Sequence, residues 1–258
     1  MMFSNSEIFN QNYAVFYEVL YKNKPHSKMS FEISTLIPKP LAKKRILEIG
    51  CGTGSFTSEI SRNFGNPILA VDSSLAMLEM ARQKNYETEI EFIHTDLLHL
   101  STSETFSLIC LLFHVVSYLT SEEEIVALIS LLKKCTSIND YVVFDFWNCA
   151  CVHLNNPQKT NSVTQLPENS ILVRTVIPEI SQAPHIWPLN IELKTVDEYN
   201  LVTGKIIERH SMRCFTTEFW VNCLSPEFTL LREWDLDSSE EYKADKYGSL
   251  LIFERTTE

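Results

Sequence analysis

Three glycines stand close together in a chain that contains only six. Gly50, Gly52 and Gly54 alternate with other residues at the end of the apolar segment 45–50, which we expect to be a strand. Because glycine has no Cβ, a turn built from it bends sharply and lets a ligand approach the backbone. The free N–H groups at the start of the following helix can then face that ligand. The spacing predicts a ligand-binding turn between a strand and a helix.

Two acidic residues follow the next predicted strands. Asp72 ends the strand at 67–71, and Asp96 follows the strand at 90–94. In the first position a carboxylate can accept both ribose hydroxyls of a dinucleotide or of S-adenosylmethionine. A dinucleotide fingerprint needs a third glycine where this chain has Ser55, and the second acid suits an adenine amino group. The residues therefore favour S-adenosylmethionine, and an NAD-dependent enzyme is the weaker alternative.

Five segments in this order resemble the class I S-adenosylmethionine-dependent methyltransferases. They are ILEIGCGTGSFT (46–57), VDSSLAMLEMAR (71–82), HTDLL (94–98), FSLICLLFHVVSYLTSEEEI (106–125) and YVVFDFWN (141–148). The segment ERHSMRCFTTEF (208–219) looks like a bacterial subgroup of small-molecule and sugar N- or O-methyltransferases with an antiparallel β cap. The resemblance implies an α/β fold, with a Rossmann-like seven-stranded sheet of order 3-2-1-4-5-7-6 whose seventh strand is antiparallel.

The resemblance also implies which residues bind the methyl donor. These are Glu48, Gly50, Cys51, Gly52, Gly54, Asp72, Ser73, Met77, Asp96, Leu97, Leu112 and Phe113. Among them Asp72 would hold the ribose, Met77 would pack beside the adenine, and Asp96 would face its amino group. Family members often have a tyrosine near position 26, where this chain has a histidine.

Methyl transfer from a sulfonium needs alignment and exclusion of water, and it needs a base only when the acceptor arrives protonated. His114 follows the fourth predicted strand and is our first candidate for that base, the alternative being a hydrogen-bonded core histidine. Tyr13, Tyr17 and Tyr21 share one helix face, where Tyr13 or Tyr21 could line the methyl site or belong to the core. His210 is a further catalytic candidate, which could bind an anionic acceptor or form a salt bridge with an acid such as Glu208 or Glu218.

Three further residues are candidates for binding the acceptor. Arg213 could hold an anionic acceptor such as a phosphorylated sugar, or form a salt bridge with an acid such as Glu208 or Glu218. Tyr118 could reach the pocket or only precede a helix, and Trp147 could stack on the acceptor or pack in the core. The segment FHVV (113–116) lacks the Asn/Asp-Pro-Pro-aromatic tetrad of methylases that act on nucleic-acid bases or glutamine amides.

Alternating strands and helices must position these residues. Between the strands, which include 107–112 and 141–147, we expect helices at 55–64, 74–84 and 122–134, preceded by two helices within 7–37. After Trp147 we expect a hairpin turning near Gly204, a helix from Thr216 or Thr217, and strands at 227–236 and 248–255. We therefore predict a donor-binding domain at 1–150 and 215–258, with residues 151–214 as a cap over the acceptor.

Composition narrows the remaining possibilities. The 258 residues are 45% hydrophobic with a formal charge of −11, which disfavours disorder and nucleic-acid substrates. We expect no membrane segment, no secretion and a cytoplasmic monomer or homodimer whose partner is a small-molecule acceptor. Seven cysteines without C-x-x-C pairs predict that most are reduced thiols, with neither a disulfide framework nor a metal. A protein that binds the donor without catalysis is the alternative function.

Overall fold

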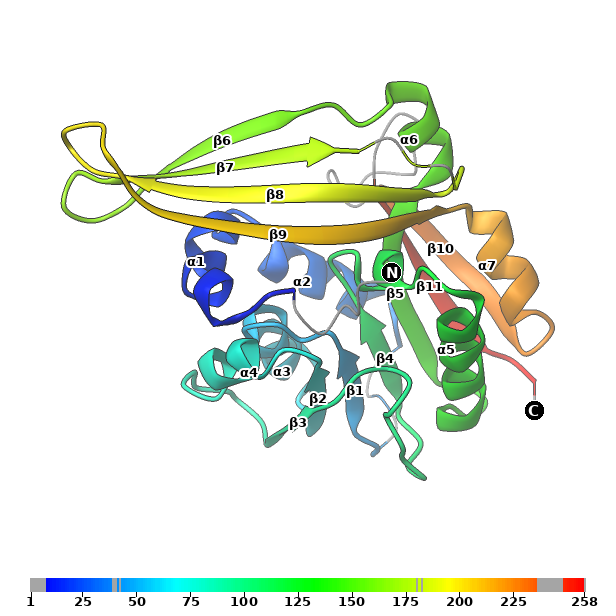
Figure 1. Cartoon of the computed structure of the whole chain (residues 1–258). Coiled ribbons are helices and arrows are strands. Elements are labelled where there is room, and N and C mark those ends of the chain that lie inside the picture. The colour runs from blue at the N-terminus through cyan, green and yellow to red at the C-terminus, as the bar shows by residue number, and fades with distance from the viewer. Residues whose placement is uncertain are drawn as a thin grey trace.

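A computed structural model of the chain describes residues 8–38, 41, 43–179, 181, 183–235 and 248–257. Figure 1 shows an α/β core whose upper end is covered by a long antiparallel sheet. Among the described residues, no helix has the length and apolarity that crossing a bilayer requires.

The core sheet has the predicted strand order. Its parallel strands are β1 (Ile46–Ile49), β2 (Ile68–Asp72), β3 (Ile90–His94), β4 (Leu108–Leu111) and β5 (Tyr141–Asn148), arranged β3-β2-β1-β4-β5. The strand β11 (Gly248–Arg255) pairs antiparallel with β5, and β10 (Phe228–Asp235) pairs with β11. Counted within the core, the order is 3-2-1-4-5-7-6 with an antiparallel seventh strand. The expected fold class is confirmed.

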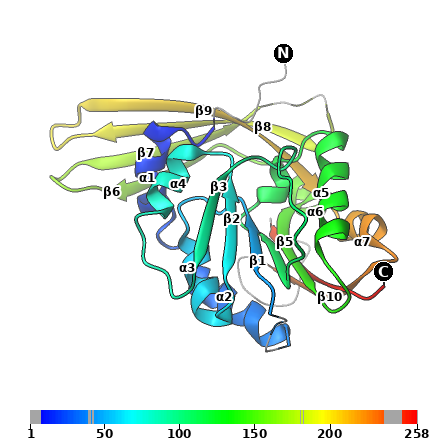
Figure 2. The ribbon, with the colours of Figure 1, turned by 90° about the horizontal axis from the view of Figure 1, so that it is seen from below.

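Helices cover both faces of the core sheet. Residues of α2 (His26–Leu36) and α3 (Ser55–Phe64) share one buried cluster with the strands, while α5 (Glu122–Cys135) and α7 (Thr217–Leu224) share another. The positions of α2 and α3 beside the sheet are visible in Figure 2. Trp220 of α7 is fully buried, and burying such an apolar side chain contributes on the order of 2–3 kcal/mol.

The second sheet consists of β6 (Thr160–Gln165), β7 (Ile171–Pro178), β8 (Ile186–Val196) and β9 (Val202–Phe215), all paired antiparallel. It crosses above α1 (Gln11–Tyr21), as Figure 1 shows. Buried residues of β7 and β8 pack with Tyr13 of α1 and Met77 of α4 (Leu75–Ala81). The last residues of β9 pair with β5, so the two sheets are continuous at that point. We call β6–β9 the cap sheet.

Two local predictions are wrong. The β8–β9 turn lies at residues 197–201, where Asp197 Oδ1 accepts hydrogen bonds from the backbone of Tyr199 and Leu201. Gly204 instead sits inside β9 opposite Thr195. The short helix α6 (Cys149–Asn155) was not predicted; the side chain of Asn148 caps it by accepting from Ala150 N and Cys151 N.

One disulfide is present that the sequence did not predict. The structure joins Cys149 to Cys214, whose Cα atoms are 4.8 Å apart. These cysteines are separated by 65 positions in the sequence, and only the pairing of Trp147 with Cys214 between β5 and β9 brings them together. The other five cysteines are free thiols, as expected.

Candidate active site

The glycine turn follows β1 and has one open side. Gly50 has φ +73°, and a Cβ at this position would lie 2.5 Å from a methyl carbon of Val115, so a larger residue is excluded. Gly52 has φ +55°, and the nearest atom to a Cβ there would be the Tyr17 hydroxyl oxygen at 4.0 Å. A ligand can therefore approach the backbone at Gly52, beneath α1.

Asp72 faces this turn from the end of β2. Its Oδ2 accepts a hydrogen bond from Gly52 N at 2.7 Å, and its Oδ1 accepts one from Ser74 N at 2.8 Å. Burial raises the pKa of Asp72, although hydrogen bonds from the backbone of Ser74 and Gly52 oppose this rise. The carboxylate thus lies where the sequence predicted it, beside the open side of the turn.

Glu48 of β1 is a second buried acid beneath the turn. Burial raises its pKa to about 8, and the nearby Thr57 hydroxyl lowers it by less. Its Oε2 has no hydrogen-bond partner in the described part of the chain. Because an unsatisfied buried polar atom is costly, this carboxyl oxygen is suited to a hydrogen bond with a ligand.

Glu18 fixes α1 over the glycine turn. It accepts hydrogen bonds from Thr53 Oγ1, from Ser55 Oγ at 3.0 Å and from Lys84 Nζ at 2.7 Å. Burial favours a higher pKa for Glu18, but the hydrogen bonds from Lys84 and Thr53 outweigh it and hold the pKa below its usual value. This anchoring places the tyrosines of α1 beside the turn.

The rings of Tyr17, Tyr21 and Phe113 form an aromatic cage around the ammonium of Lys24. Nζ lies 4.3 Å from the ring centroid of Tyr21, 4.5 Å from that of Phe113 and 5.6 Å from that of Tyr17. Burial lowers the pKa of Lys24 to about 8, even though Asp145 favours the charged form. Sequence reasoning missed Lys24, because the residue follows α1 in a segment without a recognisable pattern.

His114 and Asp145 form a pair at the ends of β4 and β5. His114 adopts φ +70°, and its backbone N donates to Asp145 Oδ2 at 2.8 Å. Its Nδ1 lies 2.9 Å from the same oxygen, which gives an ion pair when the imidazole is protonated. Asp145 is fully buried, whereas the His114 side chain keeps 29% exposure. The histidine can therefore meet a ligand while the aspartate holds it.

His210 and Tyr118 belong to a buried hydrogen-bonded chain. His210 Nδ1 lies 2.9 Å from Tyr118 Oη, and Nε2 lies 3.0 Å from Glu208 Oε2. Glu208 in turn accepts from the backbone N atoms of Phe9 and Asn10. The chain links β9, the residues before α1 and the turn of 3-10 helix at Val115–Tyr118. This arrangement matches the expected alternative for His210, a pair with an acid.

Arg213 does not contact His114, His210 or Tyr118. It forms an ion pair with Glu122 of α5 at 2.8 Å.

Another arginine, Arg174 of β7, points toward α1, with its guanidinium carbon 5.8 Å from the ring centroid of Tyr21. Its Nε is buried without a partner in the described ranges. An arginine inside the apolar segment 171–178 was the sequence signal that could have identified it.

The remaining predicted site residues make other contacts. Met77 is buried between α1 and the cap sheet, Asp96 is exposed and pairs with His99 at 2.7 Å, and Trp147 lies edge-on to His114 with ring centroids 6.4 Å apart. Cys51 and Leu112 are buried, and Leu97 packs against the core. The Ser73 carbonyl lies 3.0 Å from His94 Nε2.

Part of the chain matches a known protein family. Residues 46–137 match a family model described as a methyltransferase domain. The chain carries a class I methyltransferase domain. This segment runs from β1 into α5 and contains the glycine turn, Asp72 and His114, so the resemblance stated from the sequence is confirmed.

Two curated relatives share parts of this domain. A cypemycin N-terminal methyltransferase from Streptomyces sp is 28% identical over 91 residues, which are 35% of this chain and 37% of that protein. A malonyl-[acyl-carrier protein] O-methyltransferase from Priestia megaterium is 42% identical over 65 residues, 25% of this chain and 24% of that protein. The match thus spans well under half the length of both relatives.

Solved structures resemble the methyltransferase domain and the cap sheet together. An S-adenosylmethionine-dependent methyltransferase from Clostridium acetobutylicum superposes with a TM-score of 0.75 at 16% identity, covering 94% of this chain and 96% of its own. An amino pentose methyltransferase from Micromonospora echinaspora, solved with S-adenosylmethionine bound, gives 0.71 at 15% identity, covering 93% and 96%. A sugar N-methyltransferase from Streptoalloteichus sp gives 0.72 at 16% identity, covering 95% and 92%. At these identities the likeness establishes the fold.

Proposed function

We propose that the protein is an S-adenosylmethionine-dependent methyltransferase that methylates an N or O atom of a small polar metabolite, such as a sugar or sugar nucleotide. The observation that carries this proposal is the aromatic cage beside the glycine turn. Tyr17 belongs to both, since its hydroxyl faces Gly52 and its ring faces the Lys24 ammonium. A site that already surrounds one cation with aromatic rings suits a sulfonium.

The residues around the turn fit this donor. Asp72 would accept hydrogen bonds from the ribose hydroxyls, and the unpartnered Glu48 Oε2 would form a hydrogen bond with a polar group of the donor. Tyr21 and Phe113 would lie against the sulfonium in place of the Lys24 ammonium. When bound, S-adenosylmethionine supplies an activated methyl group on a positively charged sulfur.

His114 would act as the general base that accepts a proton from the acceptor. Its Nε2 would take the proton while Asp145, 2.9 Å from Nδ1, stabilises the resulting imidazolium. Because Asp145 is fully buried, its charge acts in a medium where water screens it little. Alignment of the acceptor and exclusion of water beneath the cap sheet would supply most of the remaining acceleration.

The acceptor would bind beneath the cap sheet. Arg174 offers a buried, unpartnered Nε from β7, which suits an anionic or strongly polar group. Tyr13 and Tyr21, whose hydroxyl oxygens are 3.2 Å apart, could align hydroxyl or amino groups. The sugar methyltransferases among the structural neighbours support a sugar-like acceptor. We propose that the partner is a small molecule and not a nucleic acid, and that the protein is a cytoplasmic monomer or homodimer.

Calorimetric titration with S-adenosylhomocysteine tests the donor site. We expect micromolar-range binding by the wild type. For Asp72→Asn we expect a roughly 10- to 150-fold higher Kd, since a hydrogen bond to a charged group contributes about 1.5–3 kcal/mol. Asp197→Asn is the matched control, because Asp197 also accepts backbone hydrogen bonds but lies in the β8–β9 turn. Equal effects of both substitutions would argue against the proposal.

Turnover separates catalysis from binding alone. Wild-type protein incubated with labelled S-adenosylmethionine and a panel of amines, amino sugars and sugar nucleotides should transfer label to at least one member. Tight binding of S-adenosylhomocysteine with no transfer across the panel would favour the non-catalytic alternative.

A further inference from the structure

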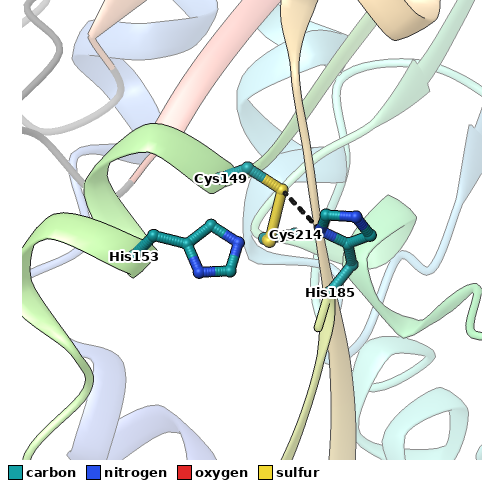
Figure 3. A group of neighbouring side chains, drawn as sticks. All are labelled: Cys149, His153, His185 and Cys214. Atoms are coloured by element: carbon teal, nitrogen blue, oxygen red, sulfur yellow. Dashed lines mark hydrogen bonds between the residues drawn. A yellow bond between two sulfur atoms is a disulfide. The ribbon is translucent and has the colours of Figure 1, made fainter. Parts of the chain in front are cut away.

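Four side chains outside the proposed active site converge where the cap sheet meets the core. Cys149 and His153 come from α6, His185 precedes β8, and Cys214 lies near the end of β9 (Figure 3). One nitrogen or sulfur atom from each lies within 4.8 Å of the others. Such a group of two thiols and two imidazoles has the composition of a metal site.

Local structure brings each pair of side chains together. Cys149 and His153 are four positions apart on α6 and therefore lie on one face of the helix. Cys214 N donates to the His185 carbonyl at 2.9 Å, which holds the other pair side by side. The β5–β9 register then brings the two pairs together, since Trp147 is paired with Cys214. Three segments distant in sequence thus supply the four groups.

The cluster combines a buried side with an accessible side. Cys149 and Cys214 are buried, and together with Val152 they pack against Trp147 and Trp187. His153 and His185 are exposed, with their ring centroids 5.8 Å apart. The imidazoles can therefore rotate toward an ion that enters from solvent, while the apolar side around the sulfurs keeps water out.

The distances suit a small tetrahedral ion. Zn²⁺ binds thiolate at about 2.3 Å and imidazole at about 2.0–2.1 Å, so its ligand atoms lie about 3.3–3.8 Å from one another. Cys149 Sγ is already 3.8 Å from His185 Nδ1. A set of two thiolates and two imidazoles favours Zn²⁺ over the hard cations Mg²⁺ and Ca²⁺, which prefer oxygen.

We propose that Cys149, His153, His185 and Cys214 bind one Zn²⁺ when the two cysteines are reduced. A dithiol reductant would open the Cys149–Cys214 disulfide with two electrons, ending as its own disulfide and leaving two thiols. Each thiol releases a proton to solvent as its sulfur binds the ion, and the two thiolates balance the charge of Zn²⁺. The ion would tie α6 to β8 and β9, next to Trp147.

Metal analysis of the purified full-length protein tests this site. The protein is prepared with a phosphine reductant, which becomes the phosphine oxide as it reduces the disulfide and competes little for zinc. We expect about one Zn²⁺ per wild-type chain. The zinc content per chain should be at least tenfold lower in Cys149→Ser and in His153→Ala. Cys223→Ser is the matched control, because Cys223 of α7 is a free thiol outside the cluster. Zinc loss in this control to the same extent would overturn the assignment.

A variant that lacks a ligand can lose zinc because it misfolds, so a second measurement uses the wild type. Reduced, zinc-free protein is titrated with Co²⁺, and we expect the visible absorption of tetrahedral cobalt together with a thiolate charge-transfer band. Oxidised wild-type protein, with the disulfide closed, should show neither band. Reduced protein that binds no zinc and gives no tetrahedral cobalt spectrum would refute the proposal.

Discussion

Lys24 should compete with the methyl donor's positive charge. Its ammonium lies 4.3 Å and 4.5 Å from the ring centroids of Tyr21 and Phe113, the rings that we propose for the sulfonium. Lys24→Met removes this cation and keeps an unbranched apolar side chain that packs well against aromatic rings. S-adenosylmethionine should therefore bind the variant more tightly, whereas the uncharged S-adenosylhomocysteine should change much less.

The size of the effect follows from the contact between the Lys24 ammonium and the aromatic rings, which is lost when the sulfonium takes its place. A cation over aromatic rings gains about 0.5–2 kcal/mol, depending on how far it is removed from water. The ratio of S-adenosylmethionine affinity to S-adenosylhomocysteine affinity should consequently rise about 2- to 30-fold in Lys24→Met.

Calorimetric titration of both ligands against three proteins measures this ratio. Besides wild type and Lys24→Met, the third is Lys22→Met, which changes the net charge equally at an exposed position two residues earlier. The ratio should be unchanged in Lys22→Met. An unchanged or lower ratio in Lys24→Met would refute the assignment of the aromatic cage to the sulfonium.

Three further outcomes follow. The raised pKa of Glu48, about 8, lets the folded state keep a proton that the unfolded chain loses above about pH 4.5. The free energy of unfolding of the wild type should therefore fall by about 2 kcal/mol between pH 6 and 8 relative to that of Glu48→Gln. An equal pH dependence of the two free energies, measured by denaturation, would contradict this. Arg174→Met should raise KM for an anionic acceptor about tenfold or more, as expected for the loss of a charged hydrogen bond. Arg213→Met should leave kcat and KM unchanged, because Arg213 pairs with the exposed Glu122. Steady-state assays of the two variants measure this difference. His114→Asn should lower kcat about 100-fold on a protonated acceptor without changing the Kd of S-adenosylhomocysteine, and a matching loss of binding would assign His114 to the donor site instead.

Much of the core could be predicted because its patterns are local. Apolar runs such as 67–71 and 107–112 have the length of buried strands and are too short for typical helices, and the glycines at the end of β1 predict a tight turn after it. Asp72 belongs to the same short-range pattern, since the end of a parallel strand next to β1 must face that turn.

The alternation of β9 explains why His210 and Arg213 pair with different acids. Successive residues of a strand face opposite sides, so Glu208, His210 and Cys214 are buried together while Arg213 points the other way. The sequence therefore contained the information that His210 and Arg213 cannot share a site.

Other features depend on contacts that no local pattern encodes. Lys24 enters the aromatic cage only because Glu18 holds α1 on the glycine turn. Cys149 and Cys214 meet through a strand pairing between segments 65 positions apart, and the helix that carries His153 begins at an asparagine cap in a segment where we predicted no helix. Each of these positions depends on contacts between segments that are distant in the sequence.

A crystal structure with S-adenosylhomocysteine would show whether the glycine turn binds the methyl donor. We predict a ligand over Gly52 whose ribose hydroxyls meet the Asp72 carboxylate and whose sulfur lies against Phe113. A saturated crystal in which the ligand is bound elsewhere and the backbone at Gly52 has no ligand contact would contradict this binding site.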